Sequence, residues 1–388
     1  MITLKKGEIG PLVEMLQLAL QRAGYSTEIN GNFNEELENI VKEFQKANSL
    51  SPDGVVGQQT WAKLEAYLLG YTTDTQGNVT QLDFNIVPTN VRYVWELLNY
   101  IVKGLGVRYP FIETGSIGKS VMGNEIFYIK IGTGPVEVMY NATHHGNEWI
   151  TTPLLLKFAE QYAKAYMDKT DIYGKSAEDL YNSKTLYIIP CVNPDGMDVV
   201  NGGLPAGEFY NKVLEISGNY PQIPFPDGWK ANVSGTDLNL NYPANWKKAK
   251  EIKFEQGYTS PAPRDFVGEE PLSAPESLAM YNFTVANHFA LTLSYHTQGK
   301  VIYWKYLDYL PKNSYTIARA LADASGYELS LTPAESAYAG YKDWFIQAFN
   351  KPGYTIEAGI GVNPLPLEQF EEIYNDNSGL LVTALEMA

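Results

Sequence analysis

From residue 89 to the end of the chain, short apolar segments alternate with segments in which apolar residues recur at helical spacing. The apolar segments are IFYIKIG, VEVMYNAT, TLYIIPCV, ALTLSYHT, KVIYW and YTIEAG. Strands that are apolar on both faces are typical of a mostly parallel sheet covered by helices on both sides. This pattern therefore predicts an α/β domain over residues 89–388.

The first 70 residues have a different pattern, which predicts a small three-helix domain. Pro11 can open the first helix, Asn34 suits the N-cap of the second, and Gly70 can end the third. Residues 71–88 are polar and have no helical period, so we expect a linker there. A chain of 388 residues is long enough for two domains.

The charge balance and hydropathy exclude some partners. Lysine and arginine total 29 against 44 acidic residues, which gives a formal charge of −15, and no basic run is present. Such a chain repels nucleic acid, so we expect no nucleic-acid partner. No apolar stretch is long enough to span a bilayer, and the N-terminus lacks the apolar centre of a signal peptide. We therefore expect no membrane segment.

Ionisable residues stand at the ends of three predicted strands. His145 and Glu148 follow the first strand, His296 ends the second, and Glu357 ends the third. The carboxyl ends of parallel strands meet at one edge of a sheet, where functional sites form. Two imidazoles and a carboxylate match the ligands of a catalytic zinc, which keeps one position for water. We therefore predict a Zn²⁺ site at His145, Glu148 and His296, with Glu357 as general base.

A second histidine, His144, directly precedes His145. Consecutive strand or loop residues point apart, so both are not expected to bind one ion. We expect His144 to pack beside the site instead.

The motifs of the first 70 residues resemble the peptidoglycan-binding-domain-1 family of three-helix wall-binding modules. The resemblance rests on LQLALQRAGY and NGNFNEELENIVKEFQKANSLSPDGVVGQQTWAKL. It implies that this module binds peptidoglycan. Together with the missing signal peptide, it leaves two expectations for localisation: the cytoplasm, or the cell wall after non-classical release or trimming of a leader.

The motifs of the larger domain resemble the zinc carboxypeptidase family, also called carboxypeptidase A-like or funnelin peptidases. They occur in the family's order: HHGNEWI, PCVNPDGM, WKANVSGTDLNLNYP, LSYHTQG and YTIEAG. The resemblance implies a mixed eight-stranded sheet covered by helices. It also selects His145, Glu148 and His296 as the zinc ligands and Glu357 as the general base.

The sequence departs from this family where a carboxypeptidase holds the free carboxylate of its substrate. Asn239 matches the asparagine of the family's Asn-Arg pair, but Leu240 stands in place of the arginine. Leucine cannot form a bidentate bond to a carboxylate. A second arginine is replaced by Lys230, which keeps a positive charge and could stabilise a developing oxyanion.

Further phrases resemble the branch of γ-D-glutamyl-diaminopimelate peptidases, which cut the stem peptides of the cell wall. These phrases are WKAN, GTDLNLNYPANW and PAPRDFVGEEPLSAPE. The resemblance implies a zinc-dependent hydrolase of peptidoglycan and muropeptides. A conventional metallocarboxypeptidase and a non-catalytic wall-binding protein are the alternatives.

Two further residues are predicted to contact the substrate. The family places a tyrosine on a loop before the last catalytic strand, and ESAYAGYKDWF offers Tyr338 or Tyr341, of which we favour Tyr338. Arg264 is a candidate for the missing carboxylate clamp. The sequence leaves open the oligomeric state, the choice between endopeptidase and carboxypeptidase action, and the choice between diaminopimelate and lysine.

Overall fold

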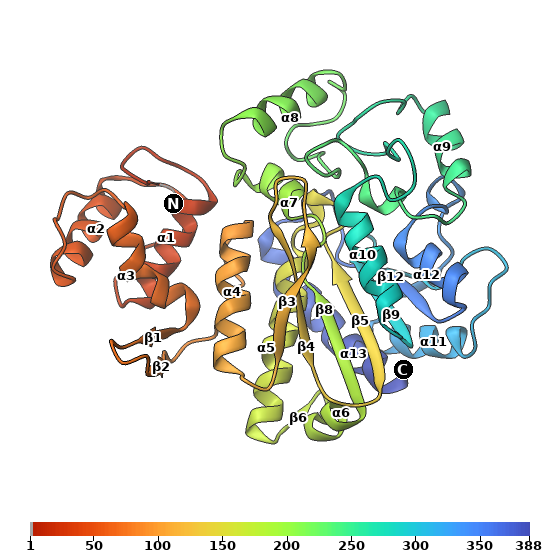
Figure 1. Cartoon of the computed structure of the whole chain (residues 1–388), viewed down its shortest axis with the longest axis horizontal. Helices are drawn as coiled ribbons and strands as arrows, with labels where there is room; N and C mark the ends of the chain where they lie inside the picture. Colours follow the sequence, from red (N-terminus) through yellow and green to blue (C-terminus); the bar gives the residue numbers. More distant parts are fainter. Residues whose placement is uncertain (1–2) are drawn as a thin grey trace.

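Three helices form the N-terminal part of the computed structural model, which describes residues 3–388 (Figure 1). They are α1 (Pro11–Arg22), α2 (Glu35–Ala47) and α3 (Gln58–Leu69). Pro11 is the first residue of α1, the Asn34 side chain accepts the Leu37 N–H at 2.9 Å, and Gly70 ends α3 in the left-handed conformation. The helix boundaries predicted from these three residues are confirmed.

The segment expected as a linker, residues 71–88, has structure of its own. It contains a short antiparallel hairpin, β1 (Tyr71–Thr73) and β2 (Val79–Gln81). Its end is fixed to the larger domain, because the Glu160 carboxylate accepts the N–H groups of Ile86 at 2.6 Å and Val87 at 3.0 Å.

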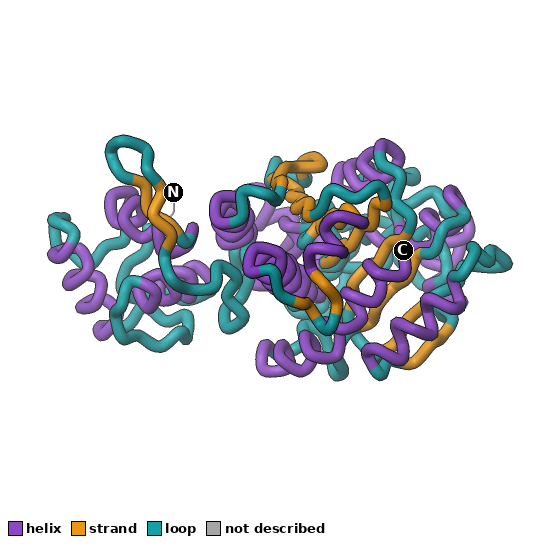
Figure 2. Tube along the Cα trace, turned by 90° about the horizontal axis from the view of Figure 1, so that it is seen from below, coloured by secondary structure: helices purple, strands orange, loops and turns teal. Residues whose placement is uncertain are grey.

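The three-helix part packs directly against the larger domain. Helix α3 lies on α4 (Trp95–Arg108), and one apolar core continues from the three helices into the larger domain. The Glu14 carboxylate of α1 accepts from both the backbone and the guanidinium of Arg92, at 2.7 and 2.8 Å. Figures 1 and 2 show the two parts side by side in perpendicular views.

The larger domain is built on an eight-stranded mixed sheet of order β11-β10-β12-β9-β5-β8-β4-β3. The strands are β3 (Glu113–Lys119), β4 (Glu125–Ile131), β5 (Val136–Ala142), β8 (Lys184–Ile189), β9 (Leu291–His296), β10 (Val301–Tyr303), β11 (Glu328–Ser330) and β12 (Gly353–Glu357). The central strands β12, β9, β5 and β8 run parallel, whereas β3 and β4 pair antiparallel with their neighbours and β10 pairs antiparallel with β12. Strand β11 pairs parallel with β10. The predicted α/β class and mixed sheet are confirmed.

Both faces of the sheet are buried under helices, as the continuous apolar strands predict. Along β5, Val138 and Tyr140 enter the apolar core that includes helices α5 and α13, while Met139 points to the core that includes α10 and α12. Since successive strand residues face opposite sides, a strand buried on both sides is apolar at most of its positions.

The remaining elements connect and cover the sheet. The helices are α5 (Thr151–Asp168), α6 (Ala177–Ser183), α7 (Pro194–Asn201), α8 (Glu208–Gly218), α9 (Trp246–Glu255), α10 (Pro275–Ala286), α11 (Ser314–Ser325), α12 (Tyr341–Phe349) and α13 (Phe370–Met387). Short elements are β6 (Asp171–Ile172), β7 (Lys175–Ser176) and the 3₁₀ turns η1 (Gly146–Glu148), η2 (Leu238–Leu240), η3 (Ala334–Ser336) and η4 (Leu367–Gln369). Within residues 3–388, no helix has the length and apolar character that crossing a bilayer requires.

Candidate metal centre

The predicted site residues meet at one edge of the sheet because their strands are parallel neighbours. Strand β9 lies between β5 and β12 and is parallel to both. His145 and Glu148 follow the end of β5, and His296 is the last residue of β9. Glu357 ends β12 directly beside His296 in the register. The ends of three strands therefore deliver all four residues to the same place.

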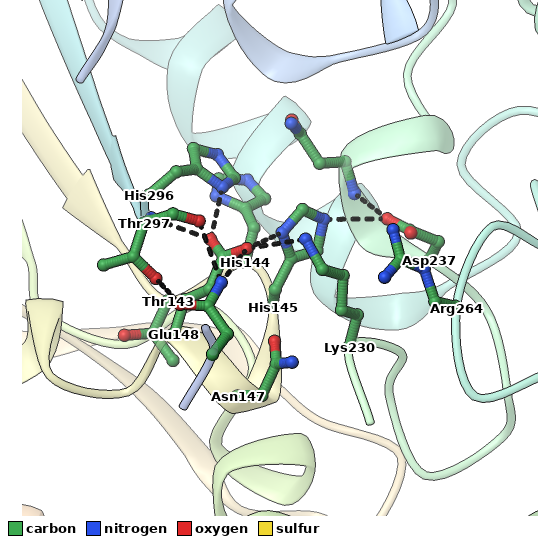
Figure 3. A network of polar contacts seen from close by, with 12 residues as sticks. Thr143, His144, His145, Asn147, Glu148, Lys230, Asp237, Arg264, His296 and Thr297 are labelled. Carbon is green, nitrogen blue, oxygen red and sulfur yellow. Dashed lines mark hydrogen bonds and ion pairs between the residues drawn. The ribbon is translucent and has the colours of Figure 1, made fainter. Parts of the chain in front are cut away.

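Both predicted histidine ligands point a ring nitrogen at the Glu148 carboxylate (Figure 3). The His145 Nδ1 lies 2.9 Å from Oε1 of Glu148, and the His296 Nδ1 lies 2.8 Å from Oε2. One possible ligand atom from each of the three residues falls within 4.8 Å of the others, and all three residues are buried. The triad therefore offers two imidazole nitrogens and a carboxylate oxygen around one point, the ligand set of a catalytic zinc.

The surroundings of His145 fit a bound cation. Its Nε2 lies 3.0 Å from Oδ1 of Asp237, so both ring nitrogens face carboxylate oxygens, which only accept. Burial lowers the pKa of His145, but the charges of Glu148 and Asp237 outweigh it and raise the pKa to about 9. His145 and Glu148 would hold a divalent cation, whose charge would replace that of a second proton on His145, and Asp237 would accept the N–H of Nε2.

The carboxylate of Glu148 is held in its ionised form. Burial raises its pKa, but the charges of His145, Lys230 and His296 outweigh burial and hold the pKa well below its usual range. The Lys230 ammonium lies 2.8 Å from Oε1, and the Thr297 N–H donates to Oε2 at 3.3 Å. Metal binding requires this deprotonated form.

Glu357 stands beside the triad and lines the same cavity, which measures about 180 Å³. Burial and the neighbouring charge of Glu148 raise the pKa of Glu357 to about 8. A carboxyl group that gains and loses its proton near neutral pH suits general acid–base work. Lys230 and Asn239 also line this cavity, and their predicted contacts with the substrate stay predictions.

His144 packs beside the site, as expected. It is fully buried, its Nε2 lies 3.0 Å from the Tyr242 hydroxyl, and its ring stacks near that of His296 with centroids 5.8 Å apart. Burial and the two neighbouring imidazoles hold its pKa well below the ordinary value. His144 therefore supports the His296 ring as a neutral side chain.

The other candidates for substrate contact occupy different places. Of the residues that the structure describes, neither Tyr338 nor Arg264 lines the cavity. Tyr338 is half-buried against apolar clusters, and the alternative Tyr341 is buried with its hydroxyl 2.9 Å from Thr284. Arg264 donates to Asp265 at 2.6 Å and lies near Asp237 in Figure 3. Their predicted contacts with substrate stay predictions.

Leu240, which replaces the family's arginine, lies in an apolar cluster. It is 7% exposed and packs with Ala249, Val267 and Ala339. The side chain at this position therefore serves packing.

Asp237 is a residue of the site that the sequence reasoning missed. It precedes η2, accepts the Asp265 N–H at 3.0 Å through Oδ2, and turns Oδ1 to His145. Burial raises the pKa of Asp237, but His145 and Lys230 hold it below the ordinary value. The motif GTDLN contains this aspartate, and a buried carboxylate near a metal histidine is the signal that could have found it.

The family models match both parts of the chain. A model described as zinc carboxypeptidase matches residues 99–378, which is more than half of the chain. The chain belongs to the zinc carboxypeptidase family. It is thus a zinc metallopeptidase, and the buried triad of His145, Glu148 and His296 is suited to hold the ion. A second model, described as a putative peptidoglycan binding domain, matches residues 9–64.

Two relatives and one solved structure are similar to most of the chain. Gamma-D-glutamyl-L-diamino acid endopeptidase 1 of Lysinibacillus sphaericus is 41% identical over 79% of this chain and 75% of its own length. The uncharacterized protein YqgT of Bacillus subtilis is 39% identical over 71% of this chain and 73% of its own length. The crystal structure of carboxypeptidase A from Helicoverpa armigera shares the fold, with a TM-score of 0.59 at 21% identity, over 91% of this chain and 87% of that one.

Proposed function

We propose that this protein hydrolyses the γ-D-glutamyl–diamino acid bond of peptidoglycan stem peptides. The observation that carries the proposal is one cavity that contains the buried triad and Glu357, in a chain that also has a peptidoglycan-binding module. The relative from Lysinibacillus sphaericus, which is named for this activity, covers most of the chain. On this proposal, this protein acts at the cell wall.

The side chains around the triad divide the work of hydrolysis. When bound, zinc supplies Lewis acidity toward water and the scissile carbonyl. Glu357 takes a proton from the attacking water and returns it to the leaving amine of the diamino acid. Lys230, whose pKa is raised because the charge of Glu148 outweighs burial, stays cationic and stabilises the negative charge that develops on the carbonyl oxygen.

Two positions of the family's substrate-binding motif bear on recognition of a stem peptide, Leu240 and Asn239. Leu240 is apolar and packs in an apolar cluster. This position therefore supplies no cation for the free C-terminus of an ordinary peptide. Asn239 stays in the cavity wall, and we propose that its amide binds the peptide backbone beside the cleaved bond. The N-terminal module holds the enzyme on its polymeric substrate.

Mass spectrometry of digested muropeptides tests this function. The substrate is the tripeptide L-Ala-γ-D-Glu-diaminopimelate, and a second sample carries an added D-Ala at its C-terminus. Release of L-Ala-D-Glu from both peptides is expected. Release of D-Ala alone from the second peptide, together with trimming of ordinary peptides such as hippuryl-amino acids, would show a conventional carboxypeptidase instead. The Glu357→Gln variant is the matched control for contaminating peptidases.

A further inference from the structure

Two buried charges in the cavity wall have no part in the chemistry described so far. Lys342 and Asp343 begin helix α12, and both line the cavity that contains the triad and Glu357. They are 4% and 2% exposed, and the Lys342 ammonium lies 2.6 Å from Oδ1 of Asp343. The cavity therefore presents a positive and a negative group next to one another.

A buried ion pair of this kind contributes little to stability. Removing two charges from water costs about as much as their attraction returns, so apolar residues of similar size often serve equally well. The residues that follow the pair in α12 are apolar. Trp344, Phe345 and Ile346 are buried in one apolar cluster. The pair is thus better explained by a ligand than by packing.

Both members of the pair keep capacity for further hydrogen bonds. An ammonium group has three N–H donors, and two of those on Lys342 go to the Lys305 carbonyl at 2.9 Å and to Asp343. A carboxylate accepts about four hydrogen bonds, and the Lys342 contact and a backbone hydrogen bond from Gly340 use two of these positions on Asp343. A ligand in the cavity can therefore bond to both groups while the pair stays intact.

A ligand group that matches such a pair has a positively charged and a negatively charged substituent on the same carbon atom. The distal end of diaminopimelate is an amino-acid group, with an ammonium and a carboxylate on one carbon atom. Lysine, the other common diamino acid of cell walls, ends in an ammonium alone. Charge-assisted hydrogen bonds from Lys342 to a carboxylate distinguish these two side chains.

We propose that Lys342 and Asp343 form the subsite for the distal amino-acid group of the diamino residue. Lys342 binds its carboxylate and Asp343 binds its ammonium. The subsite makes the enzyme selective for diaminopimelate over lysine, and it supplies a cation in this cavity although Leu240 does not. This inference rests on the proposed function and adds the identity of the preferred diamino acid.

The test compares two substrates within each variant. The peptides are L-Ala-γ-D-Glu-meso-diaminopimelate and L-Ala-γ-D-Glu-L-Lys, and kcat and KM are measured for the zinc-loaded full chain. The wild-type chain is expected to prefer diaminopimelate by at least about tenfold in kcat/KM. In Lys342→Met this ratio falls by at least about tenfold through KM, since an unpaired Asp343 still attracts the lysine ammonium. Asp343→Asn is expected to weaken the binding of both peptides.

A matched control comes from a second buried pair. Lys253 lies 2.6 Å from Asp265, is 5% exposed and belongs to α9, which does not line the cavity among the described residues. Lys253→Met is expected to change the substrate ratio by less than about twofold. A measurement on the wild-type chain covers the case in which Lys342→Met does not fold. Free diaminopimelate should then inhibit at a concentration at least about tenfold below that of free lysine.

The outcomes separate this inference from the proposed function. Cleavage of both peptides with equal efficiency, or an equal loss for both in Lys342→Met, overturns the subsite and leaves the proposed function standing. Cleavage of neither peptide overturns both. A loss of kcat/KM in Lys342→Met that affects only the diaminopimelate peptide supports both the subsite and the proposed function.

Discussion

Two groups of residues line one cavity, and they differ in how closely they follow the zinc carboxypeptidase pattern. We propose that His145, Glu148, His296 and Glu357 form a catalytic group, and that Asn239, Lys342 and Asp343 form a recognition group on the same cavity. Every residue of the catalytic group is the one that the family resemblance implies. Near the recognition group, Leu240 replaces the expected arginine and packs into an apolar cluster. On this proposal, the catalytic residues of the family are kept, whereas the residues that bind the substrate differ.

The largest expected effect comes from the catalytic group. In Glu357→Gln we expect kcat to fall by about 10² to 10⁴-fold, because the amide cannot accept the proton of the attacking water. Zinc content should stay unchanged, since Glu357 is not a ligand on this account. Glu368→Gln, at an exposed carboxylate, is the control. Full activity in Glu357→Gln would remove Glu357 from the catalytic group.

A smaller loss of activity is expected from a change at Lys230, which contacts Glu148. Lys230→Met removes the cation next to Glu148, and kcat should fall by about 10²-fold because the oxyanion loses its partner. Lys230→Arg keeps the charge and should recover most of this activity. The exposed Lys247→Met provides the comparison for a lysine away from the cavity. If Lys230→Met raised KM and left kcat unchanged, Lys230 would bind the substrate and would not stabilise the oxyanion.

Asp237 is expected to act through His145 and not through the substrate. In Asp237→Asn the side chain no longer offers a carboxylate to Nε2, and zinc affinity should fall by about 10- to 100-fold. Competition with a chromophoric chelator measures this affinity. Excess zinc should restore much of the activity. Unchanged affinity together with reduced kcat would show a different role for Asp237.

The smallest change in substrate choice is expected at Leu240. Leu240→Arg places a charge in the cluster of Ala249 and Val267, so the free energy of unfolding should fall by about 1–2 kcal/mol. Trimming of ordinary C-terminal residues should stay absent. Leu240→Met is the control for size. A gain of carboxypeptidase activity in Leu240→Arg would show that this one position separates the two substrate classes.

The sequence predicted those parts of the fold that depend on local or parallel geometry. Helix ends at Pro11, Asn34 and Gly70 could be located because caps act within one turn. The triad could be predicted because each ligand stands where a parallel strand ends. The two edge strands β3 and β11 were missed, because they lack continuous apolar residues.

Contacts between distant loops could not be predicted from one sequence. Asp237 meets His145 across 92 positions of the chain, and no periodicity signals such a pair. Lys342 and Asp343 have the sequence of an exposed helix start, and only the packing of α12 on the sheet buries them. The directions of the outer strands, which make the sheet mixed, depend on connections that local patterns do not specify.

The most direct test of the metal centre is the zinc content of the purified chain, measured by mass spectrometry of the element. The wild-type chain should keep about one zinc per molecule after gel filtration, and His296→Ala should keep less than about a tenth of that amount while remaining folded by circular dichroism. A His296→Ala chain that binds zinc as fully and as tightly as wild type would contradict the assignment of His145, Glu148 and His296 as one metal site.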